Sequence, residues 1–364
     1  ARLMNHKIKN LAAILLIGVV LAVLPFVVGS QFGNAWVRTL DFALLYVMLA
    51  LGLNIVVGYA GLLDLGYIAF YAVGAYFFAL LNSPHLAAVL PAWALHLPIW
   101  VVLPLGALLA CLFGVILGAP TLKLRGDYLA IVTLGFGEII RLFLNNLDSP
   151  VNITNGPKGI SMIDPVTLFG HPLSRSINLF GIDIPGLYLY YYFFLALALL
   201  IMLVSVRLQD SRIGRAWVAI REDEIAAAAM GINTRNIKLL AFAMGASFGG
   251  VAGGLFAGFQ GFVSPESFIL MESVMVLCMV VLGGMGHIPG IILGVVLLTL
   301  TPELLRDVVV PLQNNLWGKQ LVDPETLRML LFGLALILVM LLRPEGLWPS
   351  SRRKQELHAA EDAA

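Results

Sequence analysis

Long uncharged apolar runs recur along the whole sequence, and they constrain the fold more than any other feature. A helix needs about 20 apolar residues to cross the hydrocarbon core of a membrane. Only 12% of the 364 residues are charged, whereas a soluble domain carries about 25%. The runs are too continuous for the alternating strands of a membrane barrel. The sequence therefore predicts an all-α, polytopic membrane protein of about ten transmembrane helices, at residues 11–29, 40–58, 63–81, 98–119, 127–147, 187–206, 238–259, 269–284, 287–302 and 326–342.

The distribution of lysine and arginine orients these predicted helices. With a cytoplasmic amino terminus, 15 of the 22 basic side chains fall in inside segments and the other seven fall outside, which agrees with the positive-inside rule. The sequence thus predicts one transmembrane domain over residues 1–347, with an outer loop at 148–186 and a cytoplasmic loop at 207–237. A cytoplasmic tail follows at 348–364, so both termini lie inside. The uncharged run from Leu11 to Ser30 is predicted to be a retained span rather than a cleaved signal peptide.

The stretch GYAGLLDLGYIAFYAVGAY, Gly58–Tyr76, combines four glycines with a single carboxylate, that of Asp64. Two interpretations stay open. In the first, a helix begins around Leu62 and Asp64 lies in its first turn, where the helix dipole favours an acid. In the second, residues 58–66 are unwound, which is tolerated where backbone lines a cavity. Asp64 and Tyr67 would then face a path through the membrane.

Other polar side chains inside the predicted spans are candidates for the same path, because ionisable groups in hydrocarbon are costly and mark functional sites. Glu138 lies in mid-span, and Arg141 follows three residues later on the same helix face. A structural ion pair between them is the plainer interpretation. Glu272 lies near the outer end of its span, and Asn54 and Thr133 are deep enough to line a path.

The predicted span at 238–259 holds two ladders of glycines spaced four residues apart. Residues at this spacing share one helix face, and small residues there let two backbones approach closely. Tight packing inside the bundle is the plainer interpretation. A helix that slides against its neighbours or a partner subunit is the alternative. The ladders are Gly245, Gly249 and Gly253, and Gly250, Gly254 and Gly258.

The cytoplasmic loop at 207–237 is longer than a passive linker needs to be. Its segment REDEIAAAAMG, Arg221–Gly231, is rich in alanine and begins with acids, a composition that favours a helix. Gly231 is predicted to end that helix, and Asn233 is placed to cap the next one. The loop is therefore predicted to hold one or two short helices outside the membrane that form a docking surface.

This loop resembles the coupling loop of ABC importer permeases, in which Glu-Ala-Ala is followed by three residues and a glycine. Ile225-Ala226-Ala227 occupies the Glu-Ala-Ala positions before Gly231, with the acid one residue early at Glu224. Three further segments, GLLDLGYIAFYAVGAY, NGPKGI and LGGMGHIPG, occur in family order around IGRAWVAIREDEIAAAAMGI. Together the four segments resemble branched-chain amino acid ABC transporter permeases of the LivM type, over most of the chain from Leu40 to Leu347.

The resemblance implies a type II-like ABC importer permease in the bacterial inner membrane. It implies a second, homologous permease of the LivH type, two ATPase subunits on the cytoplasmic side and a periplasmic binding protein that delivers leucine, isoleucine or valine. The spans before and after the cytoplasmic loop would enter from opposite sides, which is compatible with an inverted repeat. The residues that the resemblance implies for contact with the ATPase are Arg221, Glu222, Asp223, Glu224 and Gly231.

The chain carries no Walker phosphate-binding motif, because its one Gly-Lys pair, Gly318-Lys319, lacks the glycine five residues earlier. We therefore expect no cofactor in this subunit and no enzymatic activity of its own, with ATP bound by the partners. The scattered histidines predict no metal site, and a net charge of +1 gives no case for nucleic acid. The partners expected from the sequence are membrane lipid and an amino acid. Two alternatives remain, the same family with another substrate, either other amino acids or urea, and an ion-coupled transporter that uses Glu138.

Overall fold

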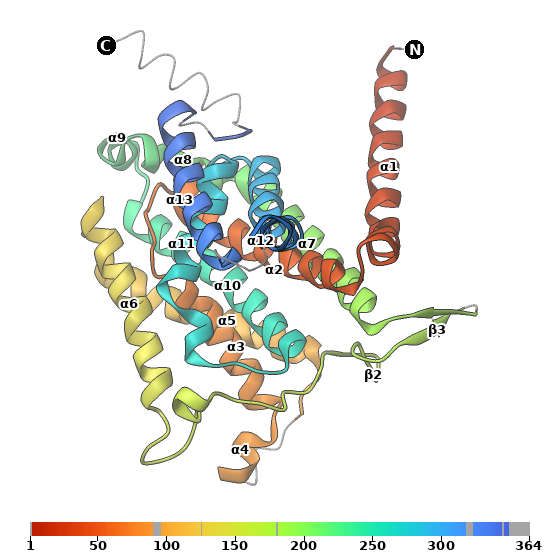
Figure 1. The fold of residues 1–364 in the computed structure, drawn as a ribbon. Helices are drawn as coiled ribbons and strands as arrows, with labels where there is room; N and C mark the ends of the chain where they lie inside the picture. The colour runs from red at the N-terminus through yellow and green to blue at the C-terminus, as the bar shows by residue number, and fades with distance from the viewer. Residues whose placement is uncertain are drawn as a thin grey trace.

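The computed structural model describes residues 2–89, 96–124, 126–179, 181–317, 323–343 and 346–348. In this part of the chain a long helix coincides with each of the ten predicted apolar runs (Figure 1). These helices are α1 (Arg2–Gln31), α2 (Asn34–Asn54), α3 (Ile68–Leu81), α5 (Ile99–Thr121), α6 (Asp127–Asn146), α7 (Gly186–Gln209), α10 (Thr234–Gln260), α11 (Leu270–Gly283), α12 (Ile288–Trp317) and α13 (Pro324–Leu342).

Helix length and composition mark the protein as a polytopic helical membrane protein. Within the described ranges, three apolar helices are too short for the crossing criterion, Leu16–Gln31, Ile68–Leu81 and Thr326–Val339. Helix α6, which carries charges, is neither among these three short helices nor among the six longer helices given next. The count of ten crossings therefore stays a prediction. The six helices long and apolar enough to cross a membrane are Asn34–Tyr59, Ile99–Thr121, Gly186–Gln209, Thr234–Gln260, Pro265–Gly283 and Ile288–Leu316.

The chain between α2 and α3 is not a simple tight turn. After α2 the helix widens into a π-helix, η1 (Ile55–Tyr59), and residues 60–67 are not helical. The predicted helix start near Leu62 is therefore wrong, and α3 begins six residues later at Ile68. Gly61 has a φ of +68°, which a helix cannot contain. With only 14 residues, α3 is about 21 Å long, shorter than the ~30 Å hydrocarbon core.

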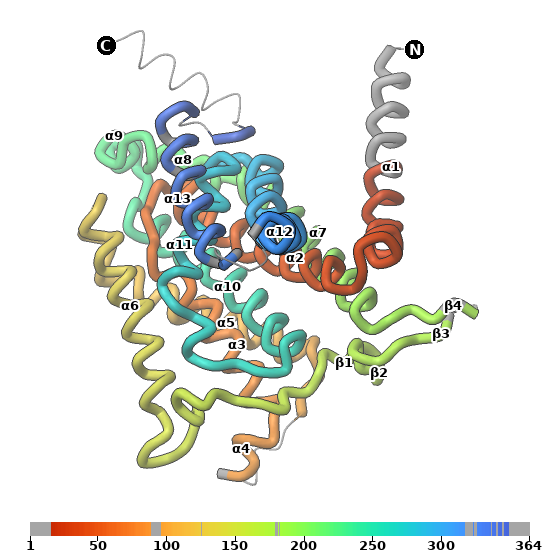
Figure 2. The backbone as a smooth tube through the Cα atoms, in the orientation of Figure 1, coloured from red at the N-terminus to blue at the C-terminus, as the bar shows by residue number. Residues whose placement is uncertain are grey.

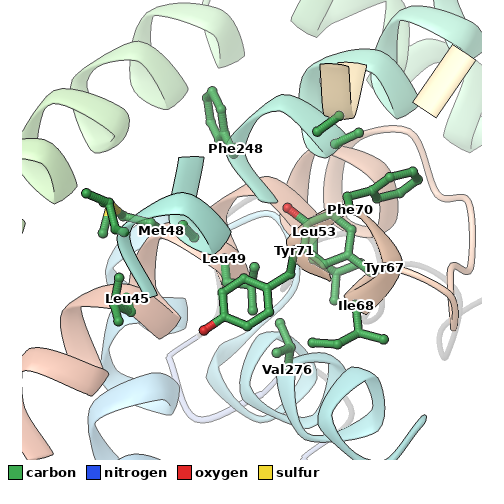
Figure 3. Packing of buried hydrophobic residues seen from close by; sticks show 14 of the residues in the cluster. Leu45, Met48, Leu49, Leu53, Tyr67, Ile68, Phe70, Tyr71, Phe248 and Val276 are labelled. Carbon is green, nitrogen blue, oxygen red and sulfur yellow. The ribbon is translucent and has the colours of Figure 1, made fainter. Parts of the chain in front are cut away.

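Helix α10 is the centre of the bundle, and its two glycine ladders explain how its neighbours approach it. On one face, a Cβ on Gly253 would clash with the Tyr71 carbonyl of α3 and lie 2.8 Å from the Ala75 nitrogen. On the other face, a Cβ on Gly250 would lie 2.5 Å from the Ala110 side chain of α5. The tight packing predicted for the ladders is confirmed, and sliding stays a prediction. Figure 3 shows the adjoining core, a buried cluster to which Phe248 of α10 contributes together with Tyr67 and Phe70.

The outer loop adds a little β-structure to the helical fold. The segment NGPKGI of this loop contains a 3-10 turn, η3 (Gly156–Lys158), and its last residue, Ile160, forms an antiparallel bridge with Val263. Figure 2 shows the two short hairpins beyond it. Strands of two or three residues carry no periodic signal that the sequence could reveal. The hairpins pair β1 (Thr167–Leu168) with β2 (His171–Pro172), and β3 (Ile177–Leu179) with β4 (Ile182–Ile184).

The opposite end of the molecule from α4 (Pro84–Val89) carries two short helices, α8 (Arg212–Glu222) and α9 (Glu224–Ala229) (Figure 1). The prediction of short helices in this loop is confirmed. The expectation of one continuous helix from Arg221 is wrong, because Asp223 leaves the helical conformation and caps α9 with its side chain. We call α8 and α9 together the coupling unit.

The carboxyl end of the described chain is held at this same end of the bundle. The backbone nitrogen of Leu347 donates to the carbonyl of Leu282 at 2.8 Å, and that of Trp348 donates to Gly283 at 3.3 Å. The predicted tail thus begins against the turn between α11 and α12. Its remaining part, 349–364, lies outside the described residues.

Candidate functional site

Asp64 lies in the non-helical segment between η1 and α3, with no surface exposed. Its Oδ1 accepts a hydrogen bond from the Gly66 nitrogen at 2.8 Å, and its Oδ2 has no hydrogen-bond partner among the described residues. Thr133 of α6 is equally buried and accepts from the Leu65 nitrogen at 3.0 Å. Two predicted path residues, Asp64 and Thr133, are therefore brought to the same segment. Backbone in this form is tolerated at membrane depth only where protein or a cavity surrounds it.

Tyr67, the third predicted path residue here, connects this segment to α10. Its hydroxyl donates to the Gly245 carbonyl at 2.7 Å, and its side chain is fully buried. The neighbouring Gly249 lies close enough that a Cβ there would be 3.4 Å from the Tyr67 hydroxyl. In this conformation Tyr67 therefore belongs to the packed core rather than to an open surface, as Figure 3 shows.

Asn54, the last residue of α2, connects η1 to the turn between α11 and α12. Its fully buried side-chain oxygen accepts from the Gly286 nitrogen at 2.9 Å. Gly58 lies against the same turn, because a Cβ there would be 2.7 Å from the Gly286 nitrogen. Two of the glycine-rich segments singled out in the sequence thus pack directly on each other.

Arg221 joins the coupling unit to the same place. Its Nη1 donates to the carbonyl oxygen of Gly58 at 2.8 Å, and its aliphatic stem packs on Gly61, where a Cβ would lie 3.2 Å from the Arg221 Cβ. The Arg221 side chain was expected to contact an ATPase. The structure directs it inward instead, onto the π-helical end of α2.

Two further contacts tie the coupling unit to the start of α10. The Nζ of Lys238, 4% exposed, lies 2.6 Å from Glu224 Oε1. On α8, the buried Trp217 donates from its indole nitrogen to the Ile237 carbonyl at 2.7 Å. A cavity of about 190 Å³ is lined by residues 60–63 and, on the coupling unit, by Arg221 and Glu224. The coupling unit and the α10 start are thus held together beside this cavity.

The remaining predicted contact residues lie on the outward side of the coupling unit. Asp223 accepts from the backbone nitrogens of two residues of α9 and so acts as its cap. Gly231 follows α9 with a φ of +86°, and a Cβ there would meet nothing within 4 Å. Glu222 is exposed, as are two apolar side chains, Ile225 at 72% and Met230 at 84%.

Two predicted path residues lie apart from this group. Glu138 pairs with Arg141, whose Nε donates to Glu138 Oε2 at 3.0 Å, which confirms the predicted ion pair. Arg141 also bonds Glu266 at 3.3 Å. Glu272 accepts from the Tyr46 hydroxyl at 2.9 Å. Neither acid joins the Asp64 segment, so the six path candidates do not form one cluster.

Two buried charged residues are not among the site residues predicted from the sequence. One is Lys238, which belongs to the predicted inside charges; its position at the start of a span and beside an acidic loop is a signal for an ion pair. Asp41 of α2 has no exposed surface, and neither of its carboxylate oxygens has a hydrogen-bond partner in the described part of the chain. It is an acid inside a predicted span, and the principle that flagged Glu138 applies to it equally.

A second cavity, of about 310 Å³, lies beside the pair His96–Asp164. None of the six path candidates lines it. Among the described residues, no three His, Cys, Asp or Glu side chains are arranged to hold a metal ion.

Comparison with known proteins defines the class that this fold and site belong to. Residues 35–340 match the family described as the permease component of branched-chain amino acid transport systems. The chain belongs to this family, a class of polytopic membrane permeases. No solved structure matches it.

Within the family, the chain is similar to a high-affinity branched-chain amino acid transport system permease protein, LivM, of Escherichia coli (strain K12). The two are 44% identical over 347 residues, 92% of this chain and 73% of that protein. LivM of Salmonella typhimurium is 43% identical, over 93% of this chain and 74% of its own length. LivH of the same Salmonella, also a permease of such a system, is 26% identical over 68% of this chain and 78% of its own length.

Proposed function

We propose that this chain is the membrane-spanning permease subunit of an ATP-driven importer of leucine, isoleucine and valine in a bacterial inner membrane. Its similarity to LivM proteins, whose names state branched-chain amino acid transport, supports the substrate class. Its more distant similarity to LivH supports assembly with a second, homologous permease. The subunit itself would bind no cofactor and catalyse no reaction, because ATP would be bound by two partner subunits.

The observation that carries the proposal is the coupling unit. Two short helices stand at one end of an apolar bundle, capped at Asp223 and followed by the exposed Gly231. Their outward side presents acids and apolar side chains, while their inward side contacts α2 and α10 through Arg221 and Glu224. An element that is exposed on one side and anchored in the spans on the other can carry force from a docked subunit into the membrane domain.

Transport would follow from alternating access. A periplasmic binding protein would dock on the outer loops and release an amino acid into a path between the two permeases. ATP binding would draw the two ATPases together and shift the coupling unit. With the coupling unit facing the ATPases, both termini and the coupling unit would lie in the cytoplasm, and the outer loop at 148–186 would lie in the periplasm.

Substitutions at Gly231 test the docking of the coupling unit, and two variants separate backbone strain from bulk. Gly231→Ala and Gly231→Trp carry the same cost of a positive φ, about 1–2 kcal/mol, but only tryptophan fills the space in front of α9. In proteoliposomes with the full complex, we expect G231A to retain most uptake and G231W to lose uptake and stimulated ATP hydrolysis. The docking assignment fails if G231W keeps both activities.

A further inference from the structure

The carbonyl of Gly58 lies where α2 ends, and this makes it a natural partner for a cation. The π-helical turn is closed by the Ala60 nitrogen, which donates to Ile55 at 3.2 Å, and the Leu62 nitrogen donates to Val56 at 3.0 Å. Carbonyls in the last turn of a helix have no partner in the next turn and carry partial negative charge. A guanidinium that donates there makes a strong, charge-assisted hydrogen bond.

Arg221 makes this bond from another element of the fold. It lies in the last turn of α8, and α8 is fixed to α10 by Trp217, while α9 is fixed to α10 by Glu224 and Lys238. The contact between Arg221 and Gly58 spans 163 residues of sequence. Any displacement of the coupling unit relative to α2 must therefore stretch, break or transmit through this bond.

Gly58 is itself locked to a second turn. Asn54 accepts from Gly286, and there is no room for a side chain between Gly58 and Gly286. The turn that contains Gly286 is in turn bonded to the carboxyl segment, because His287 Nδ1 lies 2.8 Å from the Trp348 carbonyl. A displacement of the Gly58 carbonyl would therefore also displace the α11–α12 turn.

We propose that Arg221 is a positioning residue that transmits movement of the coupling unit to the π-helical end of α2, and through Asn54 to the α11–α12 turn. This proposal rests on the proposed function and assigns one residue within it. Movement of Gly58 would carry the non-helical segment with Asp64, and the adjoining cavity of about 190 Å³ gives residues 60–63 room to move.

The test compares Arg221→Ala with Arg215→Ala in the complete transporter in proteoliposomes. Arg215 lies on the same helix and donates to the Asp210 carbonyl of its own segment, so it controls for loss of a cation from α8. We measure molecules imported per ATP hydrolysed. A hydrogen bond to a charged group changes an equilibrium constant about tenfold or more. We therefore expect R221A to lower the number of molecules imported per ATP about tenfold and R215A to leave it unchanged.

A second readout reports the movement itself. In a background with Cys111→Ser and Cys278→Ser, Leu63→Cys places one thiol beside the cavity that Arg221 lines. With Arg221 present, a membrane-impermeant maleimide should label this thiol at different rates in the ATP-free and the vanadate-trapped complex. With R221A, the two rates should be equal.

The proposal is overturned if R221A imports as many molecules per ATP as the parent, or if its labelling still depends on nucleotide. If R221A does not assemble, R221K and R221Q decide, with the expected order of coupling ratios Arg, Lys, Gln; equal ratios overturn the proposal. A parent complex without ATPase activity would instead contradict the proposed function, so the two failures are distinguishable.

Discussion

At the residue scale, Asp64 is the feature that least resembles ordinary membrane packing. It is completely buried at the end of an apolar bundle, one carboxylate oxygen is bonded to Gly66, and the other has no hydrogen-bond partner in the described chain. An acid held in this way costs free energy, and among the described residues no ion pair with Asp64 offsets that cost. We therefore propose that Asp64 serves transport rather than stability.

Replacing Asp64 with asparagine tests this assignment. Asparagine keeps the oxygen that accepts from Gly66, so the Asp64→Asn subunit should assemble with its partners in normal yield. Loss of the carboxylate should lower uptake at least tenfold, measured in proteoliposomes against the parent complex at equal protein. Unchanged uptake would show that the acid serves only the local turn.

Residue contacts differ sharply in how far the sequence predicts them. The pair Glu138–Arg141 was predictable, because its members are three residues apart on one helix. The bond between Asn54 and Gly286 joins residues 232 apart, and helical spacing says nothing about such contacts. The same holds for Arg221, whose inward direction depends on how α8 packs on α2.

At the element scale, α10 shows what the glycine ladders do. One ladder lets α2 and α3 approach, the other admits α5, and both sides are in close contact with backbone or short side chains. Such approach is how membrane helices gain dispersion energy without large side chains. The ladders therefore specify the position of α10 at the centre of the bundle.

Two matched substitutions of glycine by alanine test this role. Gly253→Ala puts a methyl group into the Tyr71 carbonyl, and because backbone cannot yield, we expect a loss of about 1–3 kcal/mol. Gly333→Ala on α13 meets open space and should be neutral or slightly stabilising. Thermal melting of the purified complex in detergent compares the two, and equal melting temperatures would contradict the packing account.

The sequence predicts a helix well where the length of an apolar run alone determines it. Every predicted run contains a helix, and helix ends agree closely at α5 and α7. The prediction stopped α12 at residue 302, but the helix continues to Trp317, because Pro302 and two acids do not break it. The break between α2 and α3 left two interpretations, since glycines permit a turn or an unwound segment and only tertiary contacts choose between them.

At the scale of the whole molecule, the two ends have different structures. One end gathers the coupling unit, the end of α2, the α11–α12 turn and residues 346–348, and hydrogen bonds connect each of these four parts to the next. The other end carries α4, the hairpins and the cavity beside His96–Asp164. This polarity supports the proposal that one end meets an ATPase and the other a delivery protein.

The central claim is that this chain imports branched-chain amino acids by the use of ATP. It is tested most directly by gentle purification of the native complex, reconstitution with its binding protein and measurement of labelled leucine uptake. We expect recovery of a second permease and two ATPase chains, and uptake that requires ATP and survives an uncoupler. Uptake that persists without ATP and collapses with the uncoupler would contradict it, as would ATP hydrolysis stimulated by urea and not by leucine, isoleucine or valine.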